Sequence, residues 1–134
     1  MTADLASKKG IFRKYDIRGI YPSEIDEELV ASVVKTLCEK LFIKGKVVVG
    51  YDPRQSSKSL HEAALAVFAN FNDIEVIDVG LITTPMLYFL VNELGATGGL
   101  MITASHNPKE YNGLKVVGKK SAFVSGERVF ELMQ

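Results

Sequence analysis

The stretch GKVVVGYD, residues 45–52, decides the fold class of this 134-residue chain. Its β-branched run ends in a turn, which is typical of a buried strand. The segments IEVIDVG at residues 74–80 and ATGGLMIT at residues 96–103 have the same character, and a helical pattern separates each strand from the next. Strand, helix, strand, helix, strand at this spacing predicts a mostly parallel sheet with right-handed crossovers.

Two helices are expected between these strands. The first begins at Ser56 or Ser57, either of which can cap it, and its inner face carries Leu60, Ala63, Ala64, Val67 and Phe68. In the second helix we expect Thr84 to be the cap and Pro85 the first residue, where a missing N–H costs nothing. This helix covers residues 86–94 and ends at Gly95, a natural residue for a helix C-terminus.

Further elements extend this core on both sides. YDIRGIYP predicts another strand, followed by a helix from about Asp26 to Phe42. Asn112-Gly113 predicts a turn into LKVVG, an antiparallel strand. SGERVFELMQ, residues 125–134, predicts a helix, whereas MTADLASKKG at residues 1–10 is expected to be a loose polar lead-in. The predicted architecture is one α/β domain over residues 1–134, a three-layer αβα sandwich with a mixed, mostly parallel sheet.

Composition excludes several classes of protein. The net charge is zero, with 16 basic and 16 acidic residues, which argues against general binding of nucleic acid or an anionic membrane. No apolar run approaches the roughly 20 residues of a membrane span, and no secretory signal is recognisable at the N-terminus. The single cysteine, Cys38, lies in a helical apolar pattern and is expected to be a small core residue in a reducing cytoplasm.

The loop after the third strand concentrates side chains that carry chemistry. TASHNPKEYNGLKV, residues 103–116, follows the apolar run GGLMI and provides a hydroxyl (Ser105), an imidazole (His106), an amide (Asn107) and a cation (Lys115). In open α/β sheets, ligands bind at the carboxyl ends of strands, where such loops gather. We therefore place the candidate functional site on this loop.

Each of these side chains also has an ordinary structural explanation. A serine in a strand-end loop is commonly a turn or cap residue, and a loop histidine is commonly just solvated. Lys115 in LKVV can point to solvent through strand alternation, and Arg18 and Tyr15 in KYDIRG can be surface groups. An arginine at a strand end is equally suited to hold phosphate through its forked donors. The residue types alone leave both interpretations open.

Asp52 and Arg54, in DPRQSS, favour an architectural role. They flank Pro53 beside the start of a predicted helix, where charge-assisted hydrogen bonds can tie a loop together. The two histidines, His61 and His106, are far apart and do not form a zinc-binding set.

Four segments resemble the α-D-phosphohexomutases, the phosphomannomutase/phosphoglucomutase enzymes. TASHNP followed by YNGLKV is similar to their phosphoserine loop. FRKYDIRG (12–19), GYDPRQSS (50–57) and GLITTP (80–85) agree in order and character, so that the resemblance covers most of the chain. It implies the αβα sandwich of the first of typically four domains, and we expect residues 1–134 to be domain I of a longer enzyme.

The resemblance also implies a chemistry: a reversible phosphoryl shift between positions 1 and 6 of mannose or glucose phosphates, through a bisphosphosugar. Ser105 would carry the phosphoryl group, with His106, Lys115 and Arg18 as catalytic residues. Substrate would be bound by Tyr15, Arg18, Asn107 and Lys115. Magnesium would reach this chain only through the phosphate on Ser105, its carboxylates lying on a missing domain. Hexose 1,6-bisphosphate would be the activator.

Other interpretations remain open at this stage. The sugar could be that of a phosphoglucosamine mutase, since sugar choice is made on another domain. The chain could instead be a module that binds phosphate or sugar phosphate without turnover, or a structural domain kept for assembly. We expect the isolated chain to fold but to be inactive. An apolar patch around Phe123, Val129, Phe130 and Met133, normally covered by the next domain, is expected to favour self-association.

Overall fold

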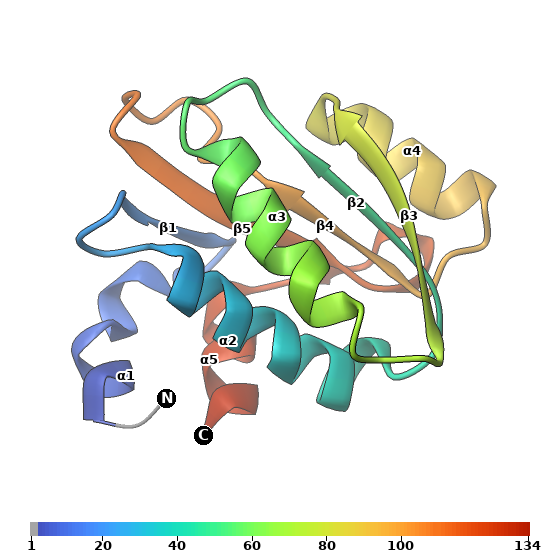
Figure 1. Cartoon of the computed structure of the whole chain (residues 1–134), viewed down its shortest axis with the longest axis horizontal. Helices are drawn as coiled ribbons and strands as arrows, with labels where there is room; N and C mark the ends of the chain where they lie inside the picture. The colour runs from blue at the N-terminus through green and yellow to red at the C-terminus, as the bar shows by residue number, and fades with distance from the viewer. Residues whose placement is uncertain (1–2) are drawn as a thin grey trace.

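The computed structural model describes residues 3–134, which form one sheet with helices on both faces (Figure 1). The elements, in chain order, are α1 (Ala3–Ser7), η1 (Lys9–Ile11), β1 (Ile17–Ile20), α2 (Glu27–Leu37), η2 (Cys38–Phe42), β2 (Gly45–Tyr51), α3 (Ser57–Phe68), β3 (Ile74–Leu81), α4 (Thr84–Glu93), β4 (Gly98–Ile102), β5 (Tyr111–Val117), η3 (Lys119–Ser121), β6 (Phe123–Val124) and α5 (Gly126–Met133).

The sheet has six strands in the order β1-β5-β4-β2-β3, with β6 pairing to β5. Strand β2 is parallel to both β3 and β4. Strand β5 is antiparallel to β4, β1 and β6. Five of the six strands described therefore run in one direction and β5 alone opposes them. The predicted mixed, mostly parallel sheet is confirmed.

Alternating side chains of the strands build two cores. In β2, Val47 and Val49 pack with apolar residues of α2, α3 and α5, whereas Val48 faces Leu87 and Val91 of α4. Period-two alternation sends successive residues to opposite faces of a sheet. Helices thus cover both faces (Figure 1), and the predicted three-layer sandwich is confirmed.

The helix starts differ in detail from those expected. Asp26 caps α2 by accepting a hydrogen bond from the Leu29 amide at 2.8 Å. The cap of α4 is Thr83, not Thr84: its hydroxyl accepts from the Met86 amide at 3.3 Å. At α3 neither predicted serine caps through its side chain, because Ser57 Oγ instead donates to Asp52 at 2.6 Å.

The predicted helix over residues 26–42 ends in a π-helical turn, η2. Cys38, its first residue, is 2% exposed, which confirms its role in the core. Burial, and secondarily the charge of Glu39, raises the pKa of the Cys38 thiol to about 12. The thiol therefore stays protonated and inert at neutral pH.

Two expectations about the chain are wrong. Asn112 and Gly113 do not form a turn but lie inside β5, and the turns lie earlier, where the amides of Asn107 and Tyr111 bond back three residues. The N-terminal segment is not a loose lead-in over the described residues 3–10, because it forms α1 and enters η1 and buries Leu5; residues 1–2 lie outside the described chain.

No helix within residues 3–134 has the length and apolar character needed to cross a membrane.

The patch predicted to be exposed near the C-terminus is largely internal. Helix α5 forms as predicted, but Val129 is fully buried and Phe130 is 8% exposed, because both pack into the core beside α2. Met133 packs against the same core. Only Phe123, at 57% exposure, is an exposed member of the predicted patch.

Candidate active site

Strand register brings the loop between β4 and β5 level with the start of β1. In β5, Leu114 pairs with Ile102, the last residue of β4, and with Ile17, the first residue of β1. Residues 103–110 therefore lie beside β1 itself, where Arg18 pairs with Gly113 and the Tyr21 amide, just after the strand, donates to the Glu110 carbonyl. Gly113 permits this approach, since a Cβ atom there would lie 2.0 Å from the carbonyl oxygen of Ile17.

Ser105 lies in this loop, half-buried, with a left-handed backbone φ of 55°. Such a conformation costs a non-glycine residue about 1–3 kcal/mol and persists where its surroundings hold it. The amide of Ser105 donates to Thr103 Oγ1 at 2.9 Å, and Thr103 in turn donates to Asp52 Oδ2 at 2.7 Å. Asp52 thus helps to fix the serine through an intervening hydroxyl.

Arg54 holds the same loop through its backbone. Its Nε donates to Asp52 Oδ2 at 3.2 Å, and its two terminal nitrogens donate to four loop carbonyls: Ser105 (2.7 Å), Asn107 (2.8 Å), Pro108 (2.7 Å) and Tyr111 (3.1 Å). A guanidinium has five N–H groups, and these five hydrogen bonds give each of them an acceptor in the protein. These contacts confirm the expectation that Asp52 and Arg54 tie the loop together.

A second ionic cluster, which we call the cationic cluster, consists of Asp16, Arg18 and Lys115. Arg18 Nε donates to both carboxylate oxygens of Asp16, at 3.0 and 2.8 Å, and Lys115 Nζ donates to Oδ2 at 2.8 Å. Arg18 Nη1 donates to the side-chain oxygen of Asn107. The Asp16 side chain is 3% exposed, whereas those of Arg18 and Lys115 are 23% and 19% exposed.

The cationic cluster has a net positive charge and N–H donors that are not used in hydrogen bonds within residues 3–134. Two cations and one carboxylate leave one net positive charge. Within residues 3–134, Arg18 has no acceptor for either N–H of Nη2 or for the second N–H of Nη1, and Lys115 uses one of its three. Partly exposed cationic donors of this kind suit a phosphate dianion, which accepts several charge-assisted hydrogen bonds.

The structure gathers some of the predicted site residues and not others. Ser105 and Asn107 share one loop, Asn107 is bonded to Arg18, and Asp16 links Arg18 to Lys115, so that Lys115 does not simply point to solvent. His106 is exposed on the loop surface. Tyr15 is 63% exposed and lies against the Phe123 ring, with the ring centroids 5.9 Å apart. Neither side chain is fixed by the two ionic clusters.

Sequence reasoning missed two residues that shape the site. Asp16 joins the two cations, and Thr103 supports Ser105. A signal for Asp16 existed, because Asp16 and Arg18 repeat the Asp-x-Arg spacing of Asp52 and Arg54.

The described residues do not fit a complete magnesium site. No group of three or more metal-binding side chains occurs within residues 3–134. The carboxylates nearest the loop, Asp16 and Asp52, are both occupied by arginine or lysine donors.

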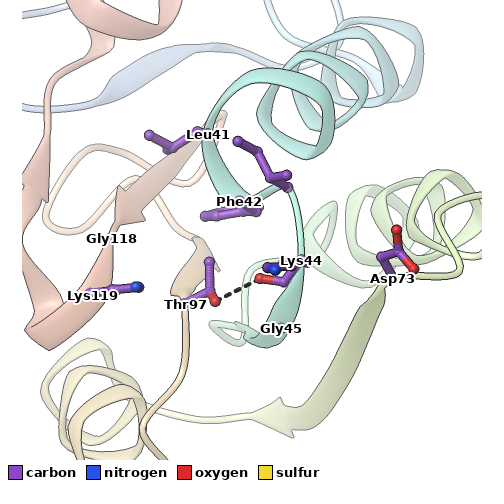
Figure 2. Close-up of a pocket in the computed structure, with 9 residues that line it drawn as sticks. Leu41, Phe42, Lys44, Gly45, Asp73, Thr97, Gly118 and Lys119 are labelled. Atoms are coloured by element: carbon purple, nitrogen blue, oxygen red, sulfur yellow. Dashed lines mark hydrogen bonds between the residues drawn. The ribbon is translucent and has the colours of Figure 1, made fainter.

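A cavity of about 930 Å³ opens at the opposite edge of the sheet (Figure 2). It lies at the amino ends of the parallel strands, where Gly45 begins β2 and Thr97 precedes β4. The Thr97 hydroxyl is bonded to the Lys44 carbonyl, so it is already engaged (Figure 2). This cavity contains no nucleophile beside an unsatisfied cationic cluster, and we assign the chemistry to the Ser105 loop.

Comparisons with known proteins agree on one family. The family model described as phosphoglucomutase/phosphomannomutase, alpha/beta/alpha domain I, matches residues 9–134. A protein of Xanthomonas campestris named "Phosphohexose mutases" is 42% identical over 116 residues, which are 87% of this chain and 25% of that protein. A probable phosphoglucosamine mutase of Methanobrevibacter smithii is 40% identical over 108 residues, 81% of this chain and 24% of the relative.

A solved structure is similar over nearly the whole chain. It is a phosphoglucomutase/phosphomannomutase family protein from Burkholderia thailandensis, with a TM-score of 0.78 and 30% sequence identity. The similarity covers 92% of this chain and 29% of that one. The chain thus spans about a quarter of the length of the relatives named above.

Proposed function

The chain belongs to the phosphoglucomutase/phosphomannomutase family as its α/β/α domain I, and on that premise we propose that Ser105 carries the phosphoryl group of a phosphohexomutase. The enzyme would interconvert hexose 1-phosphate and hexose 6-phosphate through a bisphosphosugar. One observation supports this role above the others: Ser105, with its left-handed backbone, shares a loop with Asn107, which accepts a hydrogen bond from Arg18 of the cationic cluster. The donors of Arg18 and Lys115 in that cluster are only partly used.

The proposed step is a phosphoryl transfer from Ser105 to a sugar hydroxyl. The bond between Oγ and phosphorus breaks, a bond between the sugar oxygen and phosphorus forms, and the proton of the sugar hydroxyl ends on Oγ. The reverse step then takes the other phosphate from the bisphosphosugar. Catalysis of such a transfer is mostly positioning and electrostatic stabilisation, and the net positive charge of the cationic cluster supplies the second.

Individual residues take the following roles in this proposal. Arg18 and Lys115 stabilise the charge of the transferring phosphoryl group, and Asn107, bonded to Arg18, helps to orient it. His106 and Tyr15 contact the sugar phosphate from their exposed positions beside the loop. Neither side chain makes a hydrogen bond within residues 3–134 that a ligand would first have to break.

We further propose that the chain acts as one domain of a longer enzyme. It matches only about a quarter of the length of the relatives named above. Magnesium would then be held mainly by carboxylates outside residues 3–134 and would touch this chain through the phosphate on Ser105. Hexose 1,6-bisphosphate would charge the serine, and the isolated chain would have no mutase activity.

The identity of the sugar is open between two candidates. Mannose or glucose phosphate is favoured by the name of the matching family. A glucosamine phosphate is favoured by the 40% identity to a probable phosphoglucosamine mutase. Both use the same step at Ser105, so the choice affects substrate and not the role of this domain.

Phosphorylation of Ser105 tests the proposal directly. The full-length protein is incubated with glucose 1,6-bisphosphate, and its intact mass is expected to increase by one phosphoryl group that peptide mapping places on Ser105. The Ser105→Ala variant should show no increase. A modification on another residue, or one that persists in Ser105→Ala, would contradict the assignment. Binding of sugar phosphate without any phosphorylation or turnover would favour the binding module instead.

A further inference from the structure

We propose that Arg54 is the positioning residue of the Ser105 loop, and that it acts through the geometry of its guanidinium fork and not through its charge. The fork would hold the loop in the conformation that places Ser105 beside the cationic cluster. This inference rests on the proposed function only for the role of Ser105. The hydrogen bonds of Arg54 to the loop do not depend on that role.

The fork supplies contacts that the loop lacks by itself. Within the loop, the backbone closes two turns, from Asn107 to Ala104 and from Tyr111 to Pro108. Four carbonyl oxygens of the same stretch converge instead on the terminal nitrogens of one arginine. Arg54 therefore joins four carbonyls of this stretch to one side chain, and only that of Pro108 is also the acceptor of one of the two turn hydrogen bonds.

Asn107 connects the fork to the cationic cluster. Its backbone carbonyl accepts from Arg54 Nη2 at 2.8 Å, and its side-chain oxygen accepts from Arg18 Nη1. The carbonyl of Ser105, two residues earlier, accepts from the same Arg54 nitrogen at 2.7 Å. One planar group therefore fixes both the serine and the residue that contacts Arg18, and so fixes their separation.

Lysine cannot reproduce this arrangement. The Arg54 side chain is 12% exposed, its five N–H groups all have acceptors, and its plane sets the directions of four of the bonds. A lysine ammonium has three donors and no plane. Arg54→Lys therefore keeps the charge and removes the fork. This variant distinguishes positioning by the guanidinium geometry from an effect of the positive charge alone.

A cavity beside Arg54 offers a second way to separate them. A hollow of about 480 Å³ is lined by Arg54 together with Tyr21, Gln55, Ser56, Ser59, Lys109 and Glu110. Truncation of Arg54 to alanine would open a space for a guanidinium group that adjoins this solvent-accessible hollow. Free guanidinium can then reach the loop carbonyls, at concentrations far below those that unfold proteins.

The first experiment measures amide hydrogen exchange by NMR in this 134-residue chain. In Arg54→Lys, the amides of Ser105, Asn107 and Tyr111 are expected to exchange at least about tenfold faster, because local opening of the loop becomes easier. Amides of β2 and β4 should keep their rates, which shows that the core is intact. Unchanged exchange in the loop would overturn the inference, whatever happens to activity.

The second experiment measures turnover in the full-length protein. Arg54→Lys and Arg54→Ala are expected to lower kcat by about 10- to 100-fold with a much smaller change in KM, because a small misplacement of a reacting group has effects of this size. Guanidinium should partly restore the alanine variant, whereas methylammonium should not. Arg128→Ala, which removes an exposed surface arginine with a 3.5 Å ion pair to Glu131, is the matched control.

The outcomes distinguish this inference from the proposed function. Wild-type kcat in Arg54→Lys, or equal rescue by methylammonium, would mean that charge alone matters and would overturn the inference. If the alanine variant does not fold, the lysine variant still decides. If the wild-type protein neither phosphorylates Ser105 nor turns over, the proposed function fails, while the exchange experiment continues to test whether the fork orders the loop.

Discussion

Two segments of this chain have the same spacing, Asp16-Ile17-Arg18 and Asp52-Pro53-Arg54. Each forms the same local ion pair, from arginine Nε to aspartate Oδ2, at 2.8 Å in the first and 3.2 Å in the second. Both contact the Ser105 loop, Arg18 through the Asn107 side chain and Arg54 through four backbone carbonyls. Local sequence and local geometry therefore do not distinguish them.

The two arginines differ in what their terminal nitrogens contact. Those of Arg54 donate to four backbone carbonyls and have no N–H left, whereas Arg18 bonds one side-chain amide and keeps most of its terminal donors. A fully satisfied guanidinium can only maintain structure. An unsatisfied one, partly exposed beside a second cation, is able to bind an anion. The saturation of the donors separates architecture from ligand binding.

The largest expected effect is the loss of turnover when the unsatisfied cluster is broken. In the full-length enzyme, Arg18→Ala and Lys115→Ala should each lower kcat by about 10²-fold or more, the size expected for a preorganised electrostatic contact. Melting temperature should change little, since both side chains are partly exposed. Steady-state kinetics and thermal denaturation of the same preparations check both statements. Near-normal turnover in both variants would make these cations ordinary surface charges.

The next largest effect is a loss of stability when Asp52, in the segment Asp52-Pro53-Arg54, is changed. Asp52→Asn should lower the free energy of unfolding by about 2–3 kcal/mol, because four donors converge on its carboxylate and an amide offers one oxygen and two competing N–H groups. These donors are the Arg54 amide, Arg54 Nε, Ser57 Oγ and Thr103 Oγ1. Urea denaturation measures the change.

Asp16→Asn is the matched comparison for that prediction. Its partners Arg18 and Lys115 can turn to water, so we expect a loss of stability about half as large as for Asp52→Asn, on the order of 1 kcal/mol. A larger loss at Asp16 than at Asp52 would reverse the assignment of architecture and binding.

The fold could be predicted from local patterns because its strands are short apolar runs between amphipathic helices. Residues 45–52, 74–80 and 96–103 have this character, and all became strands of the sheet. Errors arose where two neighbouring residues were equally able to cap a helix, as with Thr83 and Thr84 at the start of α4. Asn112-Gly113 is a stronger lesson. Its turn chemistry was overridden by packing, because Asn112 bonds Ser56 and Ser57 and Gly113 fits against β1.

The site could be predicted only as a set of residues and not as a network. The loop chemistry around Ser105 is contiguous in sequence and could be recognised. Lys115 and Asp16 are 99 positions apart, and the carbonyls that saturate Arg54 are 51 to 57 positions away from it. Whether an Asp-x-Arg segment is satisfied depends on these distant acceptors, which no local pattern reveals.

A smaller effect is expected at the hydroxyl of Thr103, which links Asp52 to the amide of Ser105. Thr103→Val keeps the shape of the side chain but removes the acceptor of the Ser105 amide and a donor to Asp52. We expect a loss of about 1–2 kcal/mol in the free energy of unfolding, the cost of unpaired buried polar groups. Thr103→Ser should recover most of it. If valine is neutral, the relay from Asp52 to Ser105 does not support the loop.

The smallest expected effect is the most direct test of donor saturation. Inorganic phosphate should stabilise the 134-residue chain by binding to Arg18 and Lys115, whose free donors face solvent. At about three times its dissociation constant, the gain is about 0.8 kcal/mol, or a few degrees in melting temperature. The shift should vanish in Arg18→Ala and persist in Arg54→Lys, because Arg54 has no N–H to offer. Chloride at equal ionic strength is the control for screening. A shift that instead vanishes in Arg54→Lys and persists in Arg18→Ala would place the anion on the segment that we assign to architecture, and the contrast between the two arginines would be wrong.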